Sequence, residues 1–224
     1  KEDKYSRSEL FKYFEKVGVL SESRGSESSG ISIRDDSASE YNILKSILPI
    51  SSLLRSEEYK KIKNGLSNNN KSSKIFAAIG HARLVTNGTQ LEYCNNQPVL
   101  KDDIIGIHNG IIVNEKTIWG KYPELIRSYE IDTEVFLSLY RYYLNKSNST
   151  IAAGFKSLQE IYGTVASALF FNDREELILT TNNRSLYFIT NFLDIIIFAS
   201  EKYILQVLKN KNRMINNNFD IYQC

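Results

Sequence analysis

The sequence predicts an α+β fold, because helical and extended patterns occupy separate blocks of the chain. Apolar residues recur at helical spacing near the start and again in the middle, whereas the C-terminal third holds short apolar runs separated by turn signals. Several of these runs are apolar on both faces, which is typical of strands that are covered on both sides. We therefore expect two packed, mostly antiparallel sheets enclosed by helices.

The first third of the chain predicts helices separated by polar loops. Ser6 and Glu9 have the spacing of a capping box, and the apolar residues that follow predict an amphipathic helix over residues 7–20. A polar, glycine-containing loop over residues 21–30 leads into a short strand at 31–34. A second helical stretch follows Pro49 and ends before the polar tract 67–74.

The middle of the chain predicts strands that end in polar turns. Residues 75–84 form a dense apolar strand that carries His81 and Arg83 near its exit. Residues 104–114, IIGIHNGIIVN, predict a strand, a turn and a second strand, because Asn-Gly accepts the positive φ angles of a tight hairpin. A different interpretation is an oxyanion hole, in which the Asn109 amide and the Gly110 N–H hold one developing negative charge.

The remaining elements follow from caps, periodicity and turn signals. Asp132 stands at the N-cap position of an apolar helical stripe, and Thr150 opens a further helix. Strands are predicted at residues 163–171, 176–181, 185–190 and 195–199, followed by a helix at 200–208 and a short strand at 221–222.

Composition excludes several classes of function. A chain of 224 residues is expected to form a single domain, and a net charge of +2 without a basic stripe gives no indication of nucleic-acid binding. The two cysteines and two histidines lack the spacing of a metal site, so no metal is expected. No leader or membrane-spanning apolar run is visible, and we expect a cytoplasmic protein that does not bind membranes.

Three features could together hold an amino acid. Arg83 offers a fork for an α-carboxylate, Asp132 can accept from an α-ammonium group, and Asn109 with Gly110 can stabilise the oxyanion of an attacked amide. Each also has a plain structural explanation, since Arg83 could be a solvated loop residue and Asp132 a helix cap.

Four ordered motifs resemble the glutaminase domain of class II glutamine amidotransferases: GHARLVTNG (80–88), NNQP (95–98), HNGIIVN (108–114) and DTEV (132–135). The segments SRGSESSG (23–30) and FASEKYIL (198–205) extend the resemblance over almost the whole chain. It implies the N-terminal-nucleophile hydrolase fold, a four-layer αββα sandwich of two mostly antiparallel sheets, formed by residues 1–224 as one domain that lacks its first strand. The HNGII motif is most similar to the glucosamine-6-phosphate synthase type, although Asn87 departs from that branch. The Thr86-Asn87 pair and the NQP segment instead resemble glutamate synthase and amidophosphoribosyltransferase, so the branch stays open.

The resemblance also implies roles for individual residues. Arg83 would bind the glutamine α-carboxylate in a pocket that Thr86 and Asn87 line. Asp132 would take the α-ammonium group, and Asn109 and Gly110 would form the oxyanion hole. Arg24 and Gly25 would shape the loop beside the nucleophile. Glutamine would be hydrolysed to glutamate and ammonia, without a cofactor, and ammonia would pass to a synthase domain beyond residue 224 or on a partner chain, for example for sugar-phosphate amination.

The nucleophile of this family is an N-terminal cysteine, whereas residue 1 here is Lys. Three interpretations are open. A strand that bears the cysteine precedes Lys1, or the domain is a degenerate, non-catalytic one that binds glutamine or acts as a scaffold, or Cys94 carries out other thiol chemistry. Cys94 lacks a paired histidine or an adjacent α-amine, so we expect the first interpretation, under which residues 1–224 alone are inactive.

Overall fold

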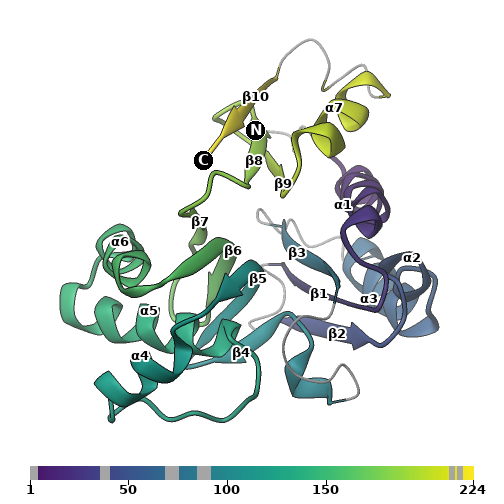
Figure 1. Cartoon of the computed structure of the whole chain (residues 1–224). Coiled ribbons are helices and arrows are strands. Elements are labelled where there is room, and N and C mark those ends of the chain that lie inside the picture. Colours follow the sequence, from purple (N-terminus) through teal and green to yellow (C-terminus); the bar gives the residue numbers. More distant parts are fainter. Residues whose placement is uncertain (1–4, 36–40, 69–75, 85–91, 212–214, 216–218) are drawn as a thin grey trace.

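The computed structural model describes residues 5–35, 41–68, 76–84, 92–211, 215 and 219–224. It confirms an α+β fold with antiparallel sheets, drawn in Figure 1. In order, the elements are α1 (Arg7–Ser21), η1 (Glu22–Arg24), β1 (Ser28–Asp35), β2 (Asn42–Ser46), α2 (Ile50–Leu53), α3 (Glu57–Asn68), β3 (Phe76–Arg83), η2 (Tyr93–Asn95), β4 (Val99–Lys101), β5 (Ile104–Ile112), α4 (Glu115–Lys121), α5 (Thr133–Ser147), α6 (Thr150–Glu160), β6 (Gly163–Phe171), β7 (Leu177–Thr181), β8 (Tyr187–Thr190), β9 (Ile196–Ala199), α7 (Lys202–Asn210) and β10 (Asp220–Gln223).

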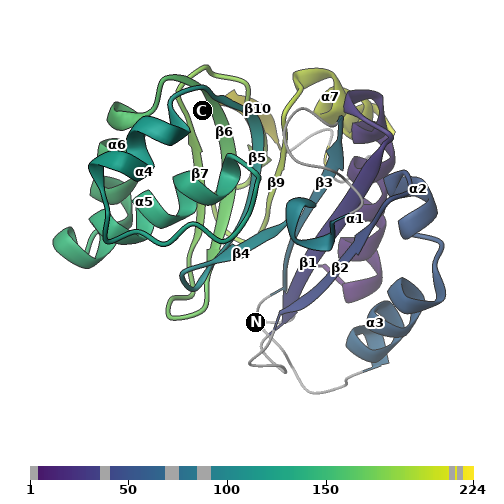
Figure 2. The same cartoon turned by 60° about the horizontal axis from the view of Figure 1, so that its bottom comes forward.

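The described strands form three antiparallel sheets rather than the two that were expected. Their strand orders are β2-β1-β3, β4-β5-β6-β7 and β10-β8-β9. Figure 2 shows the first two sheets side by side, with α1 to α3 on the outer side of one and α4 to α6 on the outer side of the other. The third sheet lies with α7 at one end of this pair (Figure 1).

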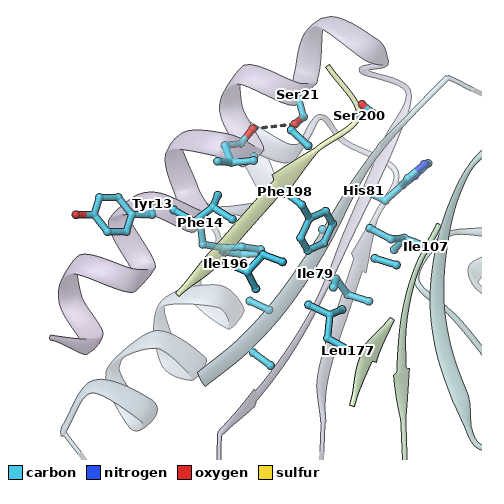
Figure 3. Close-up of a pocket in the computed structure, with 18 of the residues that line it drawn as sticks. Tyr13, Phe14, Ser21, Ile79, His81, Ile107, Leu177, Ile196, Phe198 and Ser200 are labelled. Carbon is cyan, nitrogen blue, oxygen red and sulfur yellow. Dashed lines mark hydrogen bonds between the residues drawn. The ribbon is translucent and has the colours of Figure 1, made fainter. Parts of the chain in front are cut away.

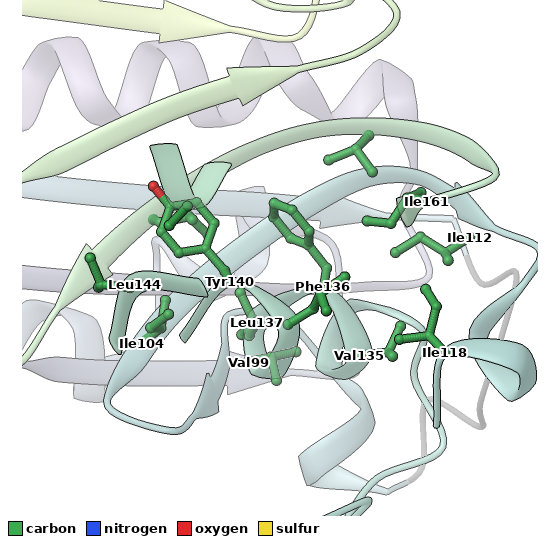
Figure 4. Close-up of a cluster of buried hydrophobic side chains, with 14 of the residues drawn as sticks. Val99, Ile104, Ile112, Ile118, Val135, Phe136, Leu137, Tyr140, Leu144 and Ile161 are labelled. Atoms are coloured by element: carbon green, nitrogen blue, oxygen red, sulfur yellow. The ribbon is translucent and has the colours of Figure 1, made fainter. Parts of the chain in front are cut away.

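Separate apolar clusters hold these layers together. One cluster packs α5 and its neighbouring helices against the β4-to-β7 sheet and contains Phe136, Leu137 and Tyr140 (Figure 4). Another packs α1 to α3 against the β1-to-β3 sheet. A third lies between the two sheets and includes Ile79 of β3 and Ile107 of β5. Because β3 and β5 are apolar on both faces, each can contact a helical layer and the opposite sheet at once.

Local sequence signals account for most element ends. α1 begins with the predicted capping box, in which the Ser6 and Glu9 side chains each bond the other's backbone N–H. The predicted strands of the C-terminal third appear as β6 to β9, and α6 begins at Thr150 with Ser149 as its cap. The helical stretch after Pro49 is divided into α2 and α3. β2, β4 and α4 were not predicted from the sequence, and β4, with only 3 residues, has too little pattern to detect.

The predicted hairpin at residues 104–114 is wrong. β5 runs without a break through His108, Asn109 and Gly110 and pairs with β6 along its whole length. Gly110 has φ of +149°, and a Cβ there would lie 2.0 Å from the Thr164 carbonyl oxygen. Close approach of β6 therefore requires this glycine. Pairing with a strand that is distant in sequence overrides the local turn preference of Asn-Gly.

A buried ion pair connects β4 to the start of α5. Lys101 Nζ lies 3.0 Å from Glu134 Oε1, and their side chains are 9% and 0% exposed. Glu134 also accepts the backbone N–H groups of Ser128 and Tyr129, at 2.6 and 2.8 Å. Lys101 donates in turn to the Ile126 carbonyl oxygen at 2.6 Å. The pair thus fixes the loop that leads to Asp132.

None of the helices among the described residues is long and apolar enough to cross a membrane.

Candidate functional site

A cavity of about 940 Å³ lies where α1, β3, β5 and β9 meet. Its size is within the range of small-molecule sites. Figure 3 shows its apolar part, in which Ile79 of β3 and Ile107 of β5 lie near Phe198 of β9. Its polar part includes Arg83, Asn109, Gly110 and Asp132. These residues come from β3, from β5 and from the start of α5, so the structure brings together side chains that are distant in sequence.

Two strand edges face this cavity. Among the described strands, β3 is the last strand of its sheet and β9 is the last strand of another. Residues 76–84 and residues 195–200 all line the cavity, whichever face of the strand they belong to. A strand whose consecutive residues line one space presents its edge to that space, because side chains alternate between faces. The cavity therefore includes a slot between two sheet edges, which we call the β3–β9 slot.

Arg83 lies at the end of β3 and is only 4% exposed. Its Nη1 donates to Asn96 Oδ1 at 3.0 Å, so the guanidinium is held in place by a neighbouring amide. Burial lowers the pKa of Arg83, while Asp132 and Glu27 act in the opposite direction. The residue is thus a buried cation near a carboxylate rather than a solvated loop arginine.

Asn109 and Gly110 occupy the part of β5 that borders the cavity. Both are half-buried, whereas the preceding residues of the strand are buried. Their position in a rigid strand, paired to Ala166 and Val165 of β6, gives a defined direction to the backbone of each. Such preorganised donors are what stabilisation of an oxyanion requires.

Asp132 stands at the N-cap position of α5, as predicted, but its side chain makes no capping hydrogen bond. Its Oδ2 instead accepts the backbone N–H of Ile112 at 2.8 Å. The helical backbone of Asp132 itself, with φ of −64° and ψ of −22°, differs from the extended conformation of capping residues. Asp132 is 4% exposed and is oriented by β5 rather than by its own helix.

The other predicted residues lie at the margin or outside the described part. Arg24 pairs with Glu201 at 2.9 Å, which connects the loop after α1 to the start of α7. Gly25 packs on β3, because a Cβ there would lie 2.2 Å from the Arg83 carbonyl carbon. Thr86 and Asn87 fall outside the described residues. Cys94 lies in η2 and is not among the described residues that line the cavity.

The two histidines are neutral groups beside the site. Burial lowers the pKa of His81 to about 3, with further lowering from His108 and Arg83. Burial also lowers the pKa of His108, against the opposite effect of Asp132. Its Nε2 lies 3.0 Å from the Thr164 carbonyl oxygen. His108 is therefore a buried residue within β5. Within the described residues, no cluster of three or more His, Cys, Asp or Glu side chains could hold a metal ion.

Three consecutive amide residues, Asn95, Asn96 and Gln97, lie beside the site although no role was predicted for them from the sequence. We call them the amide triplet. All three are buried, and each bonds a different segment near the cavity. The available signal was a run of amide side chains immediately before Pro98, which indicates a loop that makes its own hydrogen bonds.

Comparisons with known proteins agree with this architecture. The solved structure of glutamine phosphoribosylpyrophosphate amidotransferase from B. subtilis, complexed with ADP and GMP, matches 89% of this chain with a TM-score of 0.63 and 22% identity. A second structure, described as the allosteric regulatory enzyme of purine biosynthesis, matches with a TM-score of 0.64. This chain covers 40% of each of these chains. The protein thus shares the fold of the matched part of these two structures.

Sequence comparisons then assign the family. The model of the glutamine amidotransferase domain matches residues 81–207, more than half of the chain. The chain therefore belongs to the glutamine amidotransferase domain family. A glutamine–fructose-6-phosphate aminotransferase of Bacillus subtilis (strain 168) is 32% identical over 114 residues, which are 49% of this chain. The corresponding enzyme of Staphylococcus aureus (strain Mu50) is 30% identical over 110 residues. The matched part is 18% of the length of either relative.

Proposed function

We propose that this chain is the glutaminase domain of a class II glutamine amidotransferase and that its nucleophile is an N-terminal cysteine upstream of Lys1. The observation that carries the proposal is the composition of one cavity. Its polar part combines Arg83, Asp132 and the Asn109-Gly110 pair. A buried cation, a buried carboxylate and strand-borne amide donors match the carboxylate, ammonium and side-chain amide of glutamine.

The β3–β9 slot supports an upstream nucleophile. Among the described strands, β3 and β9 each pair with a single neighbouring strand, so an additional strand could pair with both at the edges that face this space. The apolar side chains of Ile79, Ile196 and Phe198 suit such a strand on its covered faces. A strand in this position would join the β1-to-β3 sheet to the third sheet, and the complete fold would be the expected sandwich of two sheets between helical layers.

The reaction follows from these roles. The cysteine sulfur bonds to the side-chain carbonyl carbon of glutamine, while the thiol proton passes to the α-amine of the same cysteine. The Asn109 amide and the Gly110 N–H stabilise the resulting oxyanion. Collapse of this intermediate transfers the proton to the leaving amine and releases ammonia, which leaves a γ-glutamyl thioester. Water then hydrolyses the thioester to glutamate and restores the thiol.

Ammonia from this domain would serve a synthase domain beyond residue 224 or on a partner chain. The names of the curated relatives describe transfer of an amino group from glutamine to fructose 6-phosphate. We propose a phosphorylated sugar as the acceptor class, in a part of the protein that this chain does not include.

The full-length protein with its mature N-terminus tests the proposal. Incubation with L-glutamine is expected to release glutamate and ammonia in equal amounts, and alkylation of the N-terminal thiol should abolish the release. A protein that binds glutamine without releasing glutamate would instead be the degenerate, non-catalytic domain. A mature sequence without an upstream cysteine, or activity that survives alkylation, would also contradict the proposed mechanism.

The charge of Asp132 provides a separate test of substrate binding. Asp132→Asn retains an oxygen that can accept the Ile112 N–H, but it removes the negative charge. We expect glutamine binding, measured by calorimetry, to weaken on the order of 10- to 100-fold, because a hydrogen bond to a charged group is typically worth about 1.5–3 kcal/mol.

Thermal unfolding of the same variant provides the control. Its free energy of unfolding should change by less than about 1 kcal/mol, since the bond to β5 is retained and Arg83 keeps both its hydrogen bond to Asn96 and the favourable charge of Glu27. If glutamine binding fell no further than the loss of stability accounts for, Asp132 would have no role in substrate binding.

A further inference from the structure

The edge of β5 that faces away from β6 is held by side chains. In β6, the backbone of Val165 bonds to Asn182, on the β7 side. Because an antiparallel ladder alternates in direction, the neighbouring Ala166 faces β5 and pairs with Asn109. The backbone N–H groups of His108, Gly110 and Ile112 therefore point off the opposite edge of β5.

β4 covers only the first part of this opposite edge, from Ile104 to Gly106. Beyond it, Gln97 takes the place of a strand. Its Oε1 accepts the His108 N–H at 2.5 Å, and its Nε2 donates to the His108 carbonyl oxygen at 2.8 Å. Asp132 accepts the Ile112 N–H farther along. The edge is thus held on both sides of Gly110, whose N–H points outward between the two held positions.

Gln97 is itself held from the opposite sheet. A Cβ at Gly30 of β1 would lie 2.1 Å from the Gln97 carbonyl oxygen, so the two backbones are in close contact. Gln97 is 6% exposed, and its carboxamide is also 3.4 Å from Thr133 Oγ1. Gln97 therefore contacts both β1 of one sheet and β5 of the other, next to Asn109, so the position of each sheet constrains the other.

The other two members of the amide triplet hold the remaining parts of the site. Asn96 Oδ1 accepts from Arg83 Nη1 at 3.0 Å. Asn95 bonds Glu130 twice, since its Oδ1 accepts the Glu130 N–H and its Nδ2 donates to the Glu130 carboxylate, each at 3.2 Å. Glu130 lies two residues before Asp132. Three consecutive amides therefore contact the segments that carry all three proposed binding elements.

We propose that the amide triplet is the positioning element of the glutamine site and that its members act on different steps. This inference rests on the proposed function. Gln97 holds β5 so that the Asn109 amide and the Gly110 N–H converge on the oxyanion, which forms only during reaction. Asn96 orients Arg83, which contacts glutamine in the ground state as well. Adjacent residues should therefore differ in their kinetic signatures.

Steady-state kinetics of glutamate release by the full-length protein test this assignment. Asn96→Ala should raise KM on the order of tenfold with little change in kcat, because a hydrogen bond to a charged group is lost. Gln97→Glu should lower kcat on the order of 10- to 100-fold with little change in KM, because a carboxylate repels the His108 carbonyl oxygen and displaces the donors.

The pH dependence of Gln97→Glu gives a readout that a loss of folding would not. A protonated glutamic acid can both donate to and accept from His108, as the amide does, and burial raises the pKa of such a group. The ratio of variant to wild-type kcat is therefore expected to rise as the pH is lowered. Gln206→Glu, at an exposed position of α7, is the matched control and should show a constant ratio near one.

The outcomes separate the inference from the function on which it rests. A wild-type protein that releases no glutamate contradicts the proposed function. An active wild type with a pH-independent Gln97→Glu ratio, or equal effects on kcat and KM in both triplet variants, overturns the inference alone. If Gln97→Glu does not fold, Asn96→Ala decides the matter, and an unchanged KM in that variant overturns the assignment.

Discussion

Replacing Asn109 with Ala is expected to lower kcat for glutamine hydrolysis by about 100- to 1000-fold, because this is the usual effect of removing one oxyanion donor. The residue lies on β5 at the border of the cavity, and its backbone is paired with Ala166. The loss should appear in kcat rather than in KM, since the oxyanion exists only after attack. Glutamate release by the full-length protein with its mature N-terminus measures both parameters.

Two controls accompany this experiment. Asn109 is half-buried and is part of a long strand, so the free energy of unfolding of the variant should remain within about 1 kcal/mol of the wild type. Asn210→Ala makes the same chemical change at an exposed position of α7 and should leave kcat unaltered. A kcat within a few-fold of the wild type in Asn109→Ala would refute the oxyanion role.

The second large effect concerns stability. Lys101→Met should reduce the free energy of unfolding by about 3–5 kcal/mol, because it leaves the fully buried Glu134 carboxylate without its cation. The Ser128 and Tyr129 N–H groups still bond Glu134, but they cannot compensate its charge. Urea denaturation of the variant and the wild type measures the difference.

An exposed ion pair provides the matched control. Lys60 and Glu57 lie 2.7 Å apart in α3, with side chains that are 53% and 76% exposed. Lys60→Met should cost less than about 1 kcal/mol, since solvent screens this pair. The double variant Lys101→Met/Glu134→Gln should lose less than the sum of its single changes, because no buried charge remains unpaired. Equal losses at the exposed and the buried lysine would show that burial does not matter here.

Prediction from the sequence was most successful where the signal was local. The capping box at Ser6 and Glu9 correctly predicted the start of α1, because its hydrogen bonds join residues three positions apart. The strand limits of β6 followed from its apolar run and the flanking turn signals. The motifs around Arg83, Asn109 and Asp132 likewise predicted residues that line one cavity.

Prediction was wrong where partners distant in sequence decide the conformation. Asn109-Gly110 has the local preference of a tight turn, yet β6 pairs across it and makes the segment one continuous strand. Asp132 has the sequence position of a cap, yet the Ile112 N–H of β5 takes its side chain. In both cases a hydrogen bond with a strand that is distant in sequence replaces the local one that the sequence favoured.

The sequence by itself determined the α+β class, most helices and strands, and the four residues Arg83, Asn109, Gly110 and Asp132 that line the cavity. Only the tertiary structure decided how those residues are held. The contacts of Gln97 with His108 and of Asn96 with Arg83 join segments whose proximity depends on the packing of two sheets. Hydrogen bonds of this kind leave no periodic pattern in the chain. The β3–β9 slot is likewise a property of two sheet edges, which no single segment encodes.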